Sequence, residues 1–147
     1  MESTPVDTQS HATALGYMIS AAVWMVIGTF AGITAGTELI APDLLGNIPW
    51  IVFGRLRAMH TTIVMFGFAV TMLIGAAFYI VPRMVKVPLF SEKMGMASLF
   101  VWNGSILAGV IALSLGYTQS REYAEMFYPS DIGVVVAFVL ILWDLIV

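Results

Sequence analysis

One histidine and two arginines form the group of residues best suited to chemistry. Arg55 and Arg57 come shortly before His60, at the start of a long uncharged run. Imidazole is a common ligand of haem iron, and guanidinium groups pair with carboxylates such as haem propionates. Because Arg57 lies one helical turn before His60, a helix places both side chains on one face. This combination is what a membrane haem requires, although a neutral His60 bonded to a carbonyl or hydroxyl group of a neighbouring helix also fits.

The residues that follow His60 predict room for a flat ring. Val64, Gly67, Thr71 and Gly75 continue the same helix face, and most of them have small side chains. A planar cofactor could therefore lie along this face.

The elements that position these residues must lie in a membrane. The 147-residue chain is 60% hydrophobic and only 10% charged, with a mean hydropathy of +0.95. Soluble domains carry about 25% charged residues, so the solvent for most of this chain is the lipid bilayer. The sequence has no cysteine, which excludes disulfides, thiolate metal sites and cysteine-linked haem. Its net charge of -3 argues against a nucleic-acid partner.

Charged residues divide the sequence into uncharged runs, which can be compared with the roughly 20 residues needed to cross a bilayer. Three runs are long enough, whereas the fourth reaches only about 24 Å at roughly 1.5 Å per residue and ends without a cap. We therefore predict an all-α integral membrane bundle with three full transmembrane helices and the start of a fourth, in which the chain stops. The predicted helices span about residues 12–40, 57–81, 94–117 and 131–147.

Two rows of small residues predict close packing between helices. Small side chains spaced four residues apart let helix backbones approach in lipid. The rows are Gly28, Gly32 and Gly36 in the first helix, and Gly104, Ala108, Ala112 and Gly116 in the third.

The counts of lysine and arginine do not decide the orientation in the membrane, because each side has three. A functional role for Arg55 and Arg57 would explain why they depart from the positive-inside rule. We therefore expect the N-terminus on the cytoplasmic side. The basic residues are Arg83, Lys86 and Lys93 on the side where the chain begins, and Arg55, Arg57 and Arg121 on the other.

Three sequence strings together resemble a known family. They are Phe53–Thr61 (FGRLRAMHT), Phe78–Val81 (FYIV) and Gly116–Glu125 (GYTQSREYAE). In order and spacing they are similar to the N-terminal part of the catalytic subunit of cbb(3)-type cytochrome c oxidases, the C-family of haem-copper oxidases. The resemblance covers most of the chain, and TQSREYAE is its most specific part. Nitric oxide reductases share the histidine of the second helix but not this string.

The resemblance implies a role for each candidate residue. His60 would be an axial ligand of a low-spin haem b, which passes electrons from c-type haem subunits toward a haem b3-copper centre where oxygen is reduced. Arg57 and Arg55 would pair with the propionates. Glu122 and Glu125 would bind calcium or lie beside the propionates, since a hard divalent ion offsets negative charges gathered there. Without the resemblance, both glutamates fit a solvated loop.

Other ligands of this family's cofactors are not found in the sequence. They come from later helices, and His11 does not replace them because it precedes the first helix, across the membrane from the start of the second. We therefore expect haem b3 and copper in the remaining oxidase helices, which belong either to a longer subunit or to another chain. The expected setting is a bacterial inner membrane with c-type cytochrome subunits as partners. Asp144, in the fourth predicted helix, is expected to contact a missing helix rather than to relay protons.

Two alternative functions stay open. The chain would be the corresponding part of a nitric oxide reductase, or a non-catalytic membrane assembly subunit in which His60 only packs. The loop after the third helix favours the oxidase over the reductase, and a haem assay would test the assembly alternative.

Overall fold

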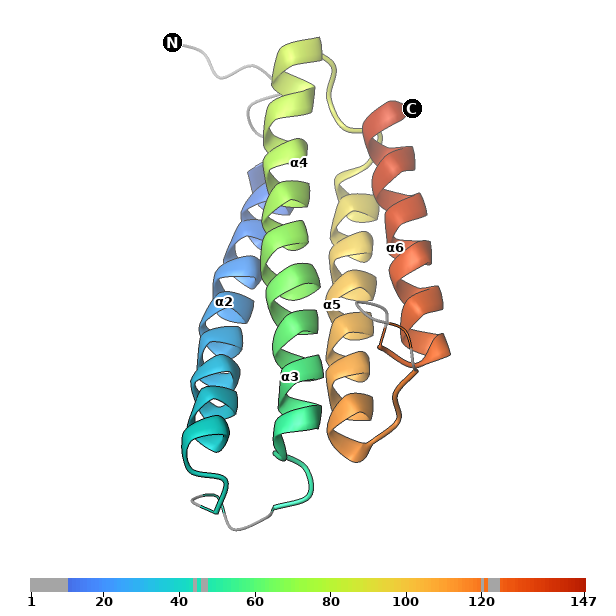
Figure 1. The fold of residues 1–147 in the computed structure, drawn as a ribbon. Coiled ribbons are helices and arrows are strands. Elements are labelled where there is room, and N and C mark those ends of the chain that lie inside the picture. The colour runs from blue at the N-terminus through green and yellow to red at the C-terminus, as the bar shows by residue number, and fades with distance from the viewer. Residues whose placement is uncertain (1–10, 44, 46–47, 120, 122–124) are drawn as a thin grey trace.

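The computed structural model describes residues 11–43, 45, 48–119, 121 and 125–147, which form a bundle of helices (Figure 1). All regular structure in these residues is helical, so the predicted all-α class is confirmed. The elements are α2 (His11–Ile40), α3 (Phe53–Thr62), the π-helix η1 (Ile63–Val70), α4 (Thr71–Val85), α5 (Glu92–Leu115) and α6 (Tyr128–Ile146).

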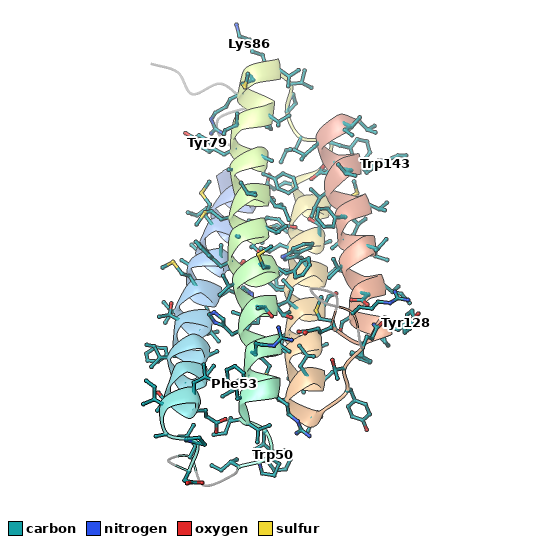
Figure 2. The ribbon with its side chains drawn as sticks, in the orientation of Figure 1. Trp50, Phe53, Tyr79, Lys86, Tyr128 and Trp143 are labelled. Carbon is teal, nitrogen blue, oxygen red and sulfur yellow. The ribbon has the colours of Figure 1, made fainter. Side chains whose placement is uncertain are left out.

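Within the part of the chain that the structure describes, four helical segments are long and apolar enough to cross a membrane, and α3, η1 and α4 together form the second of them. Large apolar side chains such as Leu73 and Phe100 point outward and are 69% and 72% exposed. Aromatic side chains lie toward the two ends, with Trp50 near one end and Tyr79 and Trp143 toward the other (Figure 2). Such belts are typical of membrane interfaces. The chain is a multi-pass membrane protein.

The helix boundaries differ from the predicted ones because charged residues lie inside the helices. The second span covers Phe53–Val85 and so includes Arg55 and Arg83, which the predicted range 57–81 left out. Helix α6 begins at Tyr128 rather than near residue 131, and Asp131 lies in its first turn, where the helix dipole favours a carboxylate. The fourth span therefore has 19 residues, close to the roughly 20 needed to cross.

The helices run up and down, so chemistry-bearing residues gather at two opposite ends (Figure 1). At one end, here the Arg57 end, α2 and α5 finish while α3 and α6 begin. At the other, the Glu92 end, α2 and α5 begin while α4 and α6 finish. Helix α5 stops at the Arg57 end because Gly116 adopts a left-handed φ of 93°, which glycine tolerates without strain.

The face predicted to leave room for a flat ring is filled by α2. A Cβ atom added to Gly67 would lie 2.9 Å from Cγ of Trp24, and one added to Gly75 would lie 3.0 Å from Cγ of Met18. These glycines therefore serve close contact between α2 and the second span. The expectation of an open slot below His60 was wrong at these positions.

Polar side chains in the bundle interior bond to one another. Thr71 is fully buried; its Oγ1 donates to the carbonyl of Phe66 and accepts from Nε1 of Trp102, both at 2.7 Å. Trp24 Nε1 donates to Asn103 Oδ1 at 2.7 Å. Since lipid offers no hydrogen-bond partner, these bonds join α2 and the second span to α5.

The small-residue rows pack only in part. Gly28 lies against Ile63, where an added Cβ would meet Cγ2 at 3.0 Å. By contrast, Gly36 and Gly104 have no neighbouring side chain within 4 Å of an added Cβ, and Ala108 is exposed. Only the first part of the α2 row and the end of the α5 row therefore take part in contacts among the described residues.

Asp144 finds its partner within the chain. It is only 2% exposed, and its Oδ1 accepts a hydrogen bond of 2.8 Å from the backbone N–H of Ser91, just before α5. Ser91 therefore satisfies one oxygen of a carboxylate that lies inside an apolar helix and needs partners. The expected contact to a missing helix stays a prediction, because Oδ2 has no hydrogen-bond partner among the described residues.

Candidate functional site

His60 lies in α3 with its ring against α2. Its Nδ1 is 2.9 Å from the carbonyl oxygen of Gly28, and the ring is half-buried. A Cβ added to Gly32 would lie 2.7 Å from His60 Cε1, so the glycine provides the space that the ring occupies. Two members of the predicted small-residue row therefore position the candidate ligand.

The bond to Gly28 selects one tautomer of the neutral imidazole. A backbone carbonyl can only accept, so a neutral His60 carries its proton on Nδ1 and keeps the lone pair on Nε2. Metal-binding histidines commonly show this arrangement, in which one ring nitrogen donates to a carbonyl and the other coordinates. The contact also matches the alternative of a histidine that only bonds a neighbouring helix.

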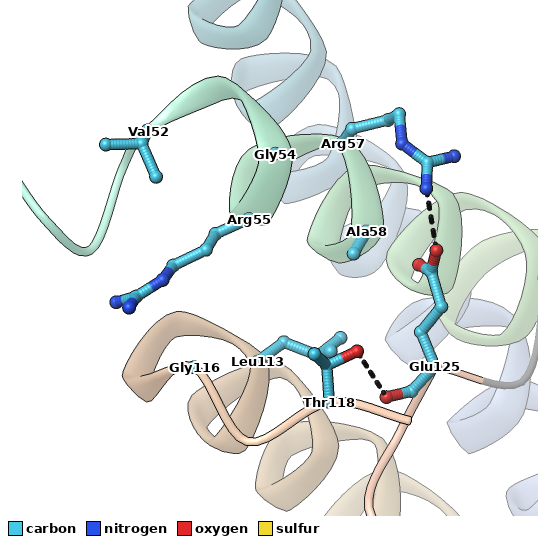
Figure 3. A pocket seen from close by; sticks show the side chains of 9 residues that line it. All are labelled: Val52, Gly54, Arg55, Arg57, Ala58, Leu113, Gly116, Thr118 and Glu125. Carbon is cyan, nitrogen blue, oxygen red and sulfur yellow. Dashed lines mark hydrogen bonds and ion pairs between the residues drawn. The ribbon is translucent and has the colours of Figure 1, made fainter. Parts of the chain in front are cut away.

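Arg57 forms an ion pair with Glu125. Its Nη2 donates to Oε1 of Glu125 at 2.7 Å, as Figure 3 shows. The arginine side chain is 49% exposed, whereas that of Glu125 is 11% exposed. A guanidinium has five N–H donors, so Arg57 keeps donors for a second anion. The structure thus brings together two of the predicted site residues.

Arg55 points away from Arg57 and toward the end of α5 (Figure 3). Its Nη1 donates to the carbonyl of Ser114 at 2.8 Å. A Cβ added to Gly116 would lie 2.9 Å from Nη2 of Arg55. Arg55 therefore satisfies one of the last carbonyls of α5, where the helix dipole favours a positive charge.

A cavity of about 380 Å³ lies between the two arginines and the turn after α5 (Figure 3). Both arginines and Glu125 line it, so it is a candidate place for an anionic group. The lining residues are Val52, Gly54, Arg55, Arg57, Ala58, Leu113, Gly116, Thr118 and Glu125.

The segment between α5 and α6 is held so that Glu125 faces Arg57. The backbone N–H of Gln119 donates to the carbonyl of Glu125 at 3.1 Å, and Thr118 Oγ1 donates to the same carbonyl at 3.3 Å. The Gln119 side chain also donates to Oδ2 of Asp131 at 2.9 Å. Glu122 lies outside the described residues, so the structure brings only Glu125 of the two predicted glutamates to the site.

The described residues contain no group of three or more His, Cys, Asp or Glu side chains that could hold a metal ion. Chain direction keeps the two histidines apart, since α2 begins at His11 at the Glu92 end whereas His60 lies toward the Arg57 end. A second imidazole for one iron is therefore not supplied by this part of the chain.

Comparison with known sequences places this geometry in a family. Residues 12–147 match the family described as Cytochrome C and Quinol oxidase polypeptide I. The chain belongs to this family. This agrees with the resemblance carried by the three sequence strings.

Individual relatives of this oxidase-family chain are moderately similar. It is 33% identical over 139 residues to the Cbb3-type cytochrome c oxidase subunit CcoN1 of Stutzerimonas stutzeri, covering 95% of this chain and 29% of the relative. It is 36% identical over 134 residues to the cytochrome c oxidase subunit 1 homolog of Agrobacterium tumefaciens, covering 90% of this chain and 24% of the relative. The chain thus spans less than a third of these relatives.

A relative of a different name also matches. The chain is 28% identical over 150 residues to a nitric oxide reductase protein of Stutzerimonas stutzeri, covering 87% of this chain and 29% of the relative. Membership of the oxidase family is therefore established, while the similarities alone do not separate these two kinds of enzyme.

Two features of the site escaped the sequence analysis. The carbonyl of Gly28 orients His60, but glycines in a small-residue row were interpreted as packing residues only. The pairing of Arg57 with Glu125 joins residues 68 positions apart. The sequence indicated this pairing only through the order of the helices, because α5 ends on the side where the second span begins.

The space for the His60 ring can be tested at Gly32. In Gly32→Ala the new methyl group would lie 2.7 Å from His60 Cε1, so the ring must move away from α2. We expect a loss of about 1–3 kcal/mol in stability, measured as a lower thermal midpoint of the assembled complex.

Gly36→Ala is the matched control, because it makes the same change on the same helix with no neighbour within 4 Å. It should leave the midpoint unchanged or raise it slightly, since alanine favours a helix over glycine by about 1 kcal/mol. Equal midpoints for both variants would show that the His60 ring is not held against α2.

Proposed function

We propose that this chain is the haem b-binding, electron-transferring N-terminal part of the catalytic subunit of a cbb(3)-type cytochrome c oxidase. The observation that carries the proposal is the His60 imidazole, whose Nδ1 bonds the Gly28 carbonyl and whose Nε2 keeps its lone pair. Family membership supports it, because oxidases of this family bind haems and copper. Similarity to the cbb3-type subunit of Stutzerimonas stutzeri supports the more specific assignment.

The residues at the Arg57 end would hold a low-spin haem b, with the His60 imidazole as a ligand of its iron. When bound, the haem would accept single electrons from c-type haems and pass them on. The hydrogen bond to Gly28 makes Nε2 of the imidazole a stronger electron-pair donor to a metal and fixes the orientation of the ring. Arg57, which spends one donor on Glu125, would hold a propionate with another, and Arg55 would face a propionate across the cavity.

Glu125 is a proposed calcium neighbour as well as the partner of Arg57. Its Oε1 accepts from Arg57, so Oε2 would be the oxygen offered to a cation. A hard divalent ion with oxygen ligands suits a place where carboxylates and propionates gather. Glu122 would be a second ligand, by the resemblance alone.

The remaining machinery would lie outside this chain. We propose that haem b3, copper and the second axial ligand of haem b belong to further oxidase helices, with c-type cytochrome subunits as electron donors. In a bacterial inner membrane, the Glu92 end and the N-terminus would face the cytoplasm, and the Arg57 end would face the periplasm, where c-type cytochromes deliver electrons.

Part of a nitric oxide reductase is the second candidate, favoured by the similarity to the reductase protein of Stutzerimonas stutzeri. Oxygen consumption by the purified complex, compared with nitric oxide consumption under the same electron donor, decides between the two. A third possibility, an assembly subunit without a cofactor, predicts that no haem depends on His60.

The central prediction concerns haem content. In the assembled complex, His60→Ala should remove one haem b, measured by a pyridine haemochrome assay, because the variant loses the axial imidazole. His11→Ala, at the other end of α2, should keep it. The chain expressed alone should not show a bis-imidazole low-spin spectrum. Unchanged haem content in His60→Ala would favour the assembly subunit.

The second prediction concerns the potential of the haem. A positive charge favours the reduced state, so Arg57→Gln should lower the haem b midpoint potential by tens of millivolts, where roughly 59 mV corresponds to a tenfold change for one electron. Arg57→Lys keeps the charge and should restore most of the difference. An unchanged redox titration of Arg57→Gln at normal haem content would remove Arg57 from the site.

The third prediction concerns the cation. Glu125→Gln keeps the side-chain shape and removes a charge, so the assembled enzyme should lose calcium, measured by metal analysis, and become insensitive to chelator while keeping its haem b. Glu122→Gln should do the same. Asp43→Asn, an exposed carboxylate at the end of α2, is the control. Wild-type metal content and chelator response in both glutamate variants would mean that neither binds calcium.

A further inference from the structure

A second polar cluster lies at the Glu92 end, far from His60. Here the first turn of α2, the first turn of α5 and the last turn of α6 meet. They bring together Thr13, Glu92 and Asp144. Thr13 is fully buried, Asp144 is 2% exposed and Glu92 is half-buried. None of the roles proposed for the Arg57 end uses these residues.

Each carboxylate has one satisfied and one unsatisfied oxygen. Oε1 of Glu92 accepts from the backbone N–H and from Oγ1 of Thr13, both at 2.8 Å. Oδ1 of Asp144 accepts from the N–H of Ser91 at 2.8 Å. By contrast, Oε2 of Glu92 and Oδ2 of Asp144 are buried without a hydrogen-bond partner. Such orphaned oxygens are costly in a helix bundle inside a membrane.

Oδ2 of Asp144 and the Thr13 hydroxyl that bonds Glu92 both lie beside Gly95. A Cβ atom added to Gly95 would lie 2.9 Å from Oδ2 of Asp144 and also 2.9 Å from Oγ1 of Thr13. Because Thr13 Oγ1 bonds Oε1 of Glu92, this carboxylate lies one hydrogen bond away from the space in front of Gly95, which Oδ2 of Asp144 borders. A glycine is needed there, since any side chain would fill that space.

No cation among the described residues balances this pair. The ion pair found in this part of the chain joins Arg57 to Glu125, at the opposite end. On α4, the guanidinium of Arg83 lies over the ring of Tyr79 and donates a hydrogen bond to the backbone carbonyl of Tyr79. Lys93 of α5 and Lys86 after α4 are exposed.

Among the described residues, one further titratable side chain lies near the cluster, and it is a phenol rather than a cation. It is Tyr17 of α2, whose hydroxyl bonds Ser98 of α5 at 2.8 Å. Asp144 is the only charged residue in the last turn of α6. Two ionised carboxylates without a counter-ion would be strongly unfavourable in so desolvated a place.

We propose that Asp144 and Glu92 form a proton-binding site. Asp144 carries a proton on Oδ2, and this O–H group donates a hydrogen bond to Oε2 of Glu92. The neutral acid keeps its carbonyl oxygen, Oδ1, as the acceptor for Ser91. Glu92 stays ionised and accepts from Thr13 through one oxygen and from Asp144 through the other. One bound proton therefore satisfies both orphaned oxygens and leaves the pair with a single negative charge.

A cavity adjoins Asp144 at the Glu92 end. This cavity of about 130 Å³ between the end of α4, the following loop and the end of α6 is lined by Asp144, together with apolar residues such as Pro82 and Leu89. Water entering this cavity would reach the carboxyl group of Asp144 from the Glu92 end. The pair can then exchange its proton with that side of the membrane.

Infrared spectroscopy of the assembled membrane complex tests the proposal. At neutral pH, the wild type should show the C=O stretching band of a protonated carboxylic acid, which shifts in D₂O and on incorporation of ¹³C-aspartate. Asp144→Asn keeps the shape and the Ser91 bond and should lose this band. Asp43→Asn, at an exposed position, should keep it.

Three further outcomes decide the question. Glu92→Gln should shift the frequency of the Asp144 band, because an amide replaces the accepting carboxylate; an unchanged frequency would overturn the pairing. Sodium added at constant pH should leave the band intact, and its loss would show a cation site instead. If Asp144→Asn does not assemble, the labelled wild type still decides, since the absence of an aspartic acid band at neutral pH would overturn the proposal.

Discussion

A bilayer interior offers no hydrogen-bond partner to a buried polar group, so each such group must be satisfied by the protein. In this chain the requirement decides which helices meet. Trp24 bonds Asn103, and Trp102 bonds Thr71, so indole N–H groups of α2 and α5 find partners on neighbouring helices. The glycines and alanines allow the helices to approach, but the polar bonds select one arrangement among many apolar ones.

The need to satisfy buried polar groups also accounts for the polar contacts at both ends of the bundle. At the Arg57 end, a half-exposed arginine and a nearly buried glutamate neutralise each other, and His60 bonds a backbone carbonyl. At the Glu92 end, two acids meet without a counter-ion among the described residues. An arginine near water can keep spare donors for an anion, whereas a carboxylate pair in a drier place gains from a proton. The two ends therefore favour opposite kinds of ligand.

Much of the fold follows from where the charges stand in the sequence. Uncharged runs revealed four helical segments, but their boundaries were misplaced because Arg55, Arg83 and Glu92 are tolerated inside helix ends, where they reach water or complement the helix dipole. His60 was identified from its type and position, since a histidine within an apolar helix is rare. Its partner, the Gly28 carbonyl, is a backbone group, so the type of the residue does not reveal it.

Contacts between distant segments were the hardest to predict. Gly67 and Gly75 were expected to border an open slot, but small residues suit a ring and a neighbouring helix equally well, and Trp24 and Tyr17 of α2 pack there. The hydrogen bond from the N–H of Ser91, just before α5, to Oδ1 of Asp144 was likewise not indicated by the sequence. The spacing of residues along one helix predicts which side chains share a face, but it does not predict which neighbouring helix packs against that face.

The π-helix η1 separates the second span into two parts that can be aimed independently. A π turn takes about one residue more than an α turn, so it changes the angular register between the segments on either side. The half that carries His60 can thus face the Gly28 carbonyl while the half that carries Thr71 faces Trp102. Removing one residue from Ile63–Val70 would restore a regular α-helix and turn one half by roughly 100° relative to the other. The length of this segment therefore decides where His60 points as much as the position of His60 in the sequence does.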